Sequence, residues 1–199
     1  MEHYISVDIE TAGPNPADYA MLSIGACHIA SISEDTFYLE LQPTTMAAQP
    51  NALRVSGLSM ARLAAEGVPP GEAMAQFVAW IGSHVPAGER PIFVGHNAPF
   101  DWMFVADYFH RFLGFNPFGH SALDLKSFYM AFANVPFHAT GLAQIAERYQ
   151  LPSTLSHHAL MDAQDQARLL QRMLDELEHR ESRSSHHAPT RTTENERST

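Results

Sequence analysis

Three acidic motifs, far apart along the chain, contain the residues best suited to chemistry. They read Asp8-Ile9-Glu10-Thr11-Ala12-Gly13, Gly95-His96-Asn97-Ala98-Pro99-Phe100-Asp101 and His157-His158-Ala159-Leu160-Met161-Asp162. Carboxylates gathered at one point repel one another and lose hydration, so a fold keeps them together mainly to hold hard divalent cations. A histidine beside such a cluster supplies a base that titrates near neutral pH. The motifs therefore predict a metal site with an adjacent base.

Each of these residues, taken alone, also has an ordinary structural explanation. Asp8 and Glu10 alternate with apolar residues, so they point the same way from a strand and would fit an exposed strand face. Asp101 and Asp162 fall in the first turns of expected helices, where a carboxylate complements the helix dipole. His157 alone is typical of a surface histidine. The combination of all five, in this order, is improbable by chance.

The composition is that of a globular domain. The chain has 199 residues, of which 45% are hydrophobic and 17% charged, which argues against disorder and fits one domain. No apolar run is long enough to span a bilayer, and the first residues lack the pattern of a secretory signal. The single cysteine, Cys27, lies in an apolar stretch, so we expect a reducing, cytoplasmic setting and no membrane partner.

The net charge restricts the possible partners. A formal charge of -10 argues against tight, non-specific binding along duplex phosphates, which needs a basic surface. The charge is compatible with an enzyme that handles one end of a strand, because bound divalent ions would reverse the local charge where a phosphate must sit.

Hydrophobic periodicity and turn residues predict the elements that must position the motifs. We expect strands at 4–10, 21–31, 36–42, 91–94 and 123–125, and helices within 52–82 (broken at 67–71), 99–113, 142–149 (capped by Thr140) and 159–178. This order predicts an α/β fold with a mixed sheet, in which an antiparallel meander gives way to parallel strands, flanked by helices. Residues 1–179 would form the domain, and 180–199 a disordered tail.

The motifs resemble those of the DnaQ-like 3′–5′ exonucleases of the DEDD superfamily, histidine subtype. That group includes the proofreading subunit of bacterial DNA polymerase III and ribonuclease T, and the resemblance covers roughly residues 3–175. The histidine of this subtype stands five positions before the last aspartate, which selects His157. The tyrosine subtype has a tyrosine four positions before Asp162, where this chain has His158. The resemblance implies a ribonuclease H-like fold, in agreement with the expected order of elements.

The resemblance also implies a role for each matching residue. It implies that two Mg²⁺ or Mn²⁺ ions are bound, that His157 is the general base, and that nucleoside 5′-monophosphates are released. The implied metal ligands are Asp8, Glu10, Asp101 and Asp162. Residues that match positions seating the 3′-terminal nucleotide are Thr11, Asn97 and Phe100. The stretch from Leu53 to Leu58, where some relatives carry a base-contacting histidine, has neither a histidine nor an aromatic residue.

Several alternatives stay open at this point. The substrate would be a single-stranded 3′ end of either DNA or RNA, and the chain could act as a homodimer or with a polymerase partner. One rival is an endonuclease of the same ribonuclease H-like class. Another is a catalytically weak binding module that serves a polymerase or an RNA-processing complex. The presence of all five motif residues favours the exonuclease.

Overall fold

The computed structural model describes residues 2–152 and 156–185, and the side chains up to 182. Its centre is a five-stranded sheet with the strand order β3-β2-β1-β4-β5. The strands are β1 (His3–Thr11), β2 (Met21–His28), β3 (Phe37–Glu40), β4 (Pro91–Gly95) and β5 (Ala122–Asp124). The pairs β1–β2 and β2–β3 are antiparallel, whereas β1–β4 and β4–β5 are parallel. The predicted mixed sheet is confirmed.

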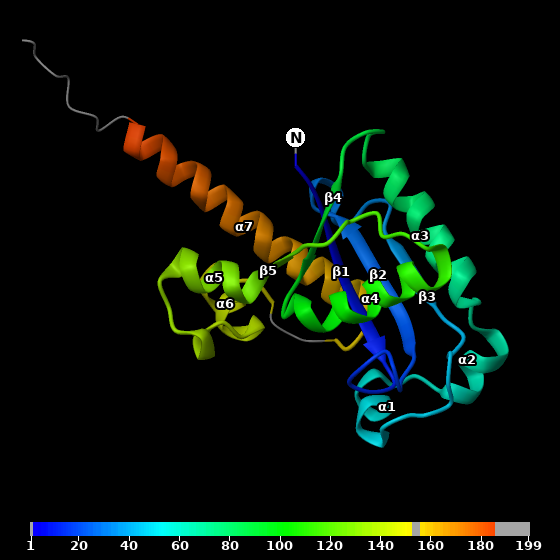
Figure 1. Ribbon diagram of the computed structural model, residues 1–199. Coiled ribbons are helices and arrows are strands. Elements are labelled where there is room, and N and C mark those ends of the chain that lie inside the picture. Colours follow the sequence, from blue (N-terminus) through cyan, green and yellow to red (C-terminus); the bar gives the residue numbers. More distant parts are fainter. Residues whose placement is uncertain (1, 153–155, 186–199) are drawn as a thin grey trace, which may run out of the picture.

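Helices cover both faces of the sheet. They are α1 (Pro50–Ser56), α2 (Met60–Glu66), α3 (Pro70–His84), α4 (Ala98–Leu113), α5 (Leu125–Ala133), α6 (Leu142–Tyr149) and α7 (Ala159–Ser185). Short 3-10 helices span Ile29–Ser31 and Phe137–Ala139. In Figure 1, α4 crosses in front of the sheet and α7 passes behind it. Within the described residues, no helix is long and apolar enough to cross a membrane.

The alternation along β1 divides its side chains between these two helical layers. Ile5, Val7 and Ile9 are buried in the core cluster that includes residues of α3 and α4. On the other face, the Ser6 hydroxyl donates to the carbonyl of Ala163 in α7, at 2.7 Å. Because α7 covers this polar face, an exposed strand face does not account for the carboxylates that follow Ser6.

A glycine lets α7 approach the sheet closely. A Cβ atom on Gly25 would lie 2.2 Å from the backbone nitrogen of Leu160 and 2.3 Å from the carbonyl carbon of Ala159. Real side chains do not tolerate such contacts, so only glycine allows the first turn of α7 to rest on β2 here. Gly25 pairs with Asp8 across the β1–β2 ladder. The third motif is thereby brought beside the first.

The last helix is longer than predicted. It continues to Ser185, so the expected helix end near 178 and the expected boundary at 179 both fall inside it. Arg180 explains the extension, because its guanidinium donates to Glu176 at 2.5 Å and lies 4.3 Å from the ring centre of Phe132. An ion pair at this spacing supports a helix. The remainder of the expected tail, 186–199, lies outside the described residues.

The region before α7 also differs from the prediction. Helix α5 was not predicted, and it begins because Asp124 ends β5 and caps the helix by accepting from the Ser127 amide at 3.0 Å. Thr140 was predicted to cap α6, but the N-cap residue of this helix is Gly141. The Thr140 hydroxyl instead donates to the carbonyl of Phe137, at 2.7 Å.

Candidate active site

The first two motifs meet at β1 and the start of α4. Asp8 and Glu10 leave β1 on the face that α7 covers, and the Ile9 amide between them donates to the Asp101 carboxylate at 3.2 Å. Asp101 lies in the first turn of α4 and is only 5% exposed. Proline in the first turn of α4 favours a helix start at this point. The turn between β4 and α4 therefore places Asp101 beside the backbone of the first motif.

The third motif completes the cluster from α7. Ligand atoms of Glu10, His157 and Asp162 all lie within 4.8 Å of one another. Asp162 is 3% exposed, and its Oδ1 accepts from both the amide and the hydroxyl of Ser156, each at 3.0 Å. The Asp162 amide donates to the His158 carbonyl at 3.0 Å. These bonds fold the segment before α7 back against the first turn of the helix.

Burial and mutual repulsion disfavour the ionised carboxylates. Burial, and then the charge of Asp162, raises the pKa of Glu10 to about 7. Burial raises the pKa of Asp101 to about 8, although hydrogen bonds from backbone amides oppose the rise. The pKa of Asp8 is raised well above its ordinary value by burial first, then by the charges of Asp101, Asp162 and Glu10. Such a cluster is stable in its charged form only beside compensating positive charge.

The donor atoms fit a hard divalent cation. The carboxylates of β1, α4 and α7 lie close enough for their charges to act on one another, and the His157 imidazole stands beside Glu10 and Asp162. Mg²⁺ and Mn²⁺ prefer oxygen donors, and a bound cation would offset both the burial and the mutual repulsion that raise these pKa values. The residues present therefore suit the metal that the motifs predict.

His157 occupies an unusual backbone conformation. Its φ angle is 51°, in the left-handed region, and its side chain is exposed at the edge of the cluster. Residues other than glycine rarely adopt this region, and such strain costs about 1–3 kcal/mol. Strain of this kind persists where surrounding contacts impose it, and it collects at functional sites.

Gln166 is a buried part of the site that the sequence did not single out. It lies four residues after Asp162, on the same face of α7, and is 3% exposed. Its amide nitrogen donates to the Asp8 carboxylate at 2.7 Å, and its amide oxygen accepts from the His96 amide at 3.0 Å. The spacing of four from Asp162 was the signal available in the sequence. Gln166 orients Asp8 and ties it to the turn before α4.

The three residues predicted to seat a nucleotide lie on, or directly before, the elements that carry Glu10 and Asp101. Thr11 ends β1, and its hydroxyl donates to the carbonyl of Gly13 at 2.9 Å. Asn97 precedes α4 with a φ angle of 66°, is exposed, and makes no side-chain cap bond. Phe100 is half-buried against Phe104, with the ring centres 5.6 Å apart. The side-chain amide of Asn97 is therefore not used to cap α4.

A cavity of about 180 Å³ opens at the cluster. Two of the residues that line it, Glu10 and His157, belong to the cluster. The remaining lining residues are Ser23, Tyr38, Glu40, Ser56, Leu58 and His158. Both a predicted metal ligand and the predicted base therefore face the same accessible space.

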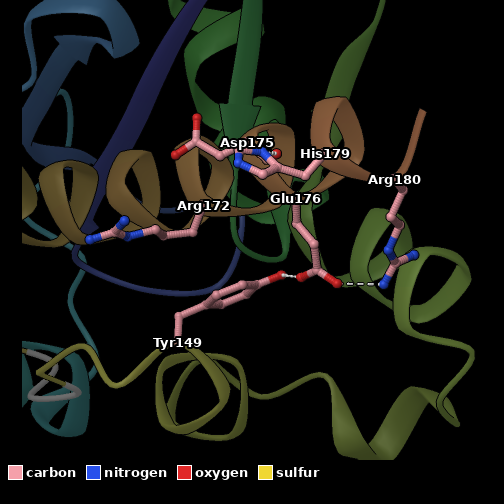
Figure 2. Close-up of a pocket in the computed structure, with 6 residues that line it drawn as sticks. All are labelled: Tyr149, Arg172, Asp175, Glu176, His179 and Arg180. Carbon is pink, nitrogen blue, oxygen red and sulfur yellow. Dashed lines mark hydrogen bonds and ion pairs between the residues drawn. The ribbon is translucent and has the colours of Figure 1, made fainter. Parts of the chain in front are cut away.

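A larger cavity, of about 490 Å³, lies away from the carboxylates, between α6 and the second half of α7. Figure 2 shows Glu176 pointing from α7 toward Tyr149 and Arg180. The Glu176 carboxylate accepts from Tyr149 at 2.9 Å, from Arg148 at 2.8 Å and from Arg180 at 2.5 Å. Because Glu176 already bonds to Tyr149, Arg148 and Arg180, we assign these residues a structural role in joining α6 to α7.

Comparison with known proteins agrees with this geometry. The profile of the Exonuclease (RNase_T) family matches residues 5–170. The chain is 44% identical over 176 residues to the 3′-5′ DNA exonuclease Cap18 of Escherichia coli, covering 88% of this chain and 93% of that protein. It is also 28% identical over 106 residues to the PolC-type DNA polymerase III of Staphylococcus haemolyticus, covering 53% of this chain but 7% of the polymerase.

Solved structures share the fold. The nuclease domain of 3′hExo, a DEDDh family member bound to rAMP, superimposes with a TM-score of 0.72 at 16% identity, covering 88% of this chain and 92% of that one. Escherichia coli Exonuclease I in complex with a dT13 oligonucleotide gives a TM-score of 0.69 at 16% identity, covering 93% of this chain and 43% of that one. The chain therefore belongs to the Exonuclease family, of the DnaQ-like type that its motifs predict.

Proposed function

We propose that the protein is a metal-dependent 3′–5′ exonuclease that shortens single-stranded DNA and releases nucleoside 5′-monophosphates. One observation carries the proposal: carboxylates from β1, α4 and α7 converge beside an imidazole, with Glu10, His157 and Asp162 within 4.8 Å. DNA is preferred to RNA because the relative at 44% identity is named a DNA exonuclease.

Asp8, Glu10, Asp101 and Asp162 would hold the metal. Two divalent ions bound there would supply charge stabilisation and would make water more acidic. The raised pKa values of Glu10, Asp8 and Asp101 indicate that the chain does not neutralise this charge by itself. We infer that the protein contributes an aligned set of anionic oxygens, which Gln166 and the Ile9 amide keep in place.

His157 would accept the proton of the attacking water. Its position at the edge of the cluster, exposed and near Glu10 and Asp162, gives it access to water and to carboxylates that stabilise the imidazolium. An imidazole can accept a proton and is a common general base in enzymes. Thr11, Asn97 and Phe100 would seat the terminal nucleotide, since Thr11 follows Glu10, Phe100 precedes Asp101, and Asn97 lies at the start of the helix that carries Asp101.

The role of His157 is tested by a matched pair of variants. We expect His157→Ala to lower turnover by about 10²–10⁴-fold, as loss of a general base does. His110→Ala removes another exposed histidine, on α4, and should leave turnover unchanged. Binding of Mn²⁺, followed by calorimetry, should be retained by both variants. Full activity of His157→Ala would refute the proposed role.

The direction and the substrate are tested with modified strands. We expect linear single-stranded DNA to be degraded, and the same DNA with a blocked 3′ end, or closed into a circle, to resist. An RNA strand of equal sequence should be degraded more slowly. Cleavage of the circle would identify an endonuclease instead, and faster degradation of RNA would reverse the substrate assignment. Binding without cleavage in the presence of Mg²⁺ or Mn²⁺ would identify a binding module.

A further inference from the structure

The segment that carries His157 is fixed on both sides of that residue. On one side, Ser156 donates twice to the Asp162 carboxylate, at 3.0 Å. On the other side, the ring of His158 stacks on Tyr38 of β3, with ring centres 4.5 Å apart and planes inclined by 23°. His157 lies between these two contacts in a left-handed conformation. An exposed side chain on a strained backbone depends on such neighbours for its direction.

The sheet register explains why Tyr38 meets this segment. Asp8 pairs with Gly25, and Gly25 pairs with Tyr38, so the three residues form one row across β1, β2 and β3. Directly paired residues share a face of the sheet. The first turn of α7 rests on Gly25 in the middle of this row. Asp8 and Tyr38 therefore flank the start of α7 from opposite sides.

The ring of Tyr38 is itself held in place. Its hydroxyl donates to Glu40, two residues along β3, at 3.2 Å. Glu40 in turn accepts from Arg62 of α2, at 2.6 Å. The strand backbone and this pair of contacts limit the motion of the tyrosine. His158 therefore stacks on a fixed surface.

We propose that Tyr38 is a positioning residue, which directs the His157 imidazole toward the carboxylate cluster by stacking on His158. The inference rests on the proposed role of His157. The stacking needs an aromatic ring at 158 but no particular polar atom. Within the described part of the chain, the Nδ1 atom of His158 is buried without a hydrogen-bond partner.

A double-mutant cycle tests whether Tyr38 acts through His157. We expect Tyr38→Ala to lower kcat by about 10–100-fold, the scale of a misplacement near 1 Å, with KM for single-stranded DNA little changed. In the His157→Ala background the same change should have almost no further effect, because the group being positioned is already missing. A residue that only stabilises the fold would lower kcat equally in both backgrounds.

Conservative variants and a matched control separate the loss of the stacked ring from a general loss of packing. Tyr38→Phe and His158→Phe keep a stacked ring and should keep kcat within about 3-fold of the parent, well above the loss expected for a misplaced base. Tyr149→Ala is the control, since Tyr149 is also half-buried and also donates to a glutamate that an arginine contacts. This control should leave kcat unchanged while removing a comparable amount of packing.

A second readout needs neither metal nor substrate. Nuclear Overhauser contacts between the His157 ring and the side-chain protons of Glu10 should be present in the parent and in Tyr149→Ala, and should be lost in Tyr38→Ala. Parental kcat in Tyr38→Ala, equal losses in both backgrounds, or retained contacts would each overturn the positioning role while leaving the exonuclease assignment intact. Full activity of His157→Ala would instead overturn the role of His157, and the positioning role with it.

Discussion

Replacing Glu10 with glutamine should stabilise the metal-free protein. The substitution keeps the size of the side chain but removes a charge that is partly buried beside Asp162. An active-site carboxylate that is arranged to hold a cation destabilises the fold when the cation is removed. Neutralising Glu10 should therefore raise the free energy of unfolding, at the expense of metal binding.

The size of the effect follows from the pKa of Glu10, which rises from its ordinary 4.5 to about 7. A tenfold change in an ionisation constant corresponds to about 1.4 kcal/mol, so the unscreened penalty of the ionised form is about 3 kcal/mol. Because Glu10 is partly exposed, solvent screens the charge, and we expect roughly 1–2 kcal/mol. For a chain of this length, that difference corresponds to about 2–8 °C in Tm.

The pH dependence identifies the cause. Below about pH 4.5 the carboxyl of Glu10 is protonated in both the folded and the unfolded chain, so it contributes no penalty. As the pH rises from 4.5 to about 7, the unfolded chain loses this proton first, and the folded protein loses stability relative to it. The Tm difference between Glu10→Gln and the parent should therefore be small at pH 4.5 and reach its full value near pH 8.

Thermal unfolding followed by circular dichroism, with EDTA present, measures this difference. Saturating Mg²⁺ should stabilise the parent more than Glu10→Gln, because the variant has lost a ligand. A Tm difference that is absent at pH 8, or that is larger at pH 4.5 than at pH 8, would refute the electrostatic reasoning. So would equal stabilisation of both proteins by Mg²⁺.

Three further substitutions, the first with a matched control, test the packing of α7, the support of Asp8 and the effect of pH on stability. Gly25→Ala should lower both Tm and turnover, because the added Cβ would meet the α7 backbone. Gly82→Ala is the control: a Cβ there meets no atom within 4 Å, so turnover should be unchanged and Tm should not fall. Gln166→Met should lower kcat by about 10-fold, through loss of the hydrogen bond to Asp8. Burial is the main cause that lowers the pKa of His28, so the protein should lose stability as the pH falls below about 6.5, and His28→Leu should reduce that loss in unfolding scans between pH 7 and 5.

The sequence was sufficient for the parts of the fold that depend on local pattern. Alternation of apolar and polar residues located β1 and directed Asp8 and Glu10 to one face, and Pro99 indicated the start of α4. The order of strands and helices then predicted the mixed sheet. These features succeed because periodicity and turn residues act over a few positions of the chain.

The features that the sequence did not reveal depend on contacts between distant residues. Gln166 and Asp8 are 158 positions apart, and neither residue indicates that the other is its partner. The stacking of Tyr38 on His158 depends on the register of three strands and on the close approach at Gly25. The end of α7 was misplaced because Arg180 stabilises that turn through α5 as well as through its own helix.

The products of the reaction at the carboxylate cluster distinguish a 3′–5′ exonuclease from the alternatives. A single-stranded DNA labelled at its 5′ end would be incubated with the protein and Mg²⁺, and samples taken over time would be resolved by length. We expect a ladder that shortens one nucleotide at a time from the 3′ end, with release of nucleoside 5′-monophosphates, and no reaction in EDTA. Internal cuts, degradation that survives EDTA, or an intact strand under Mg²⁺ and Mn²⁺ would contradict it.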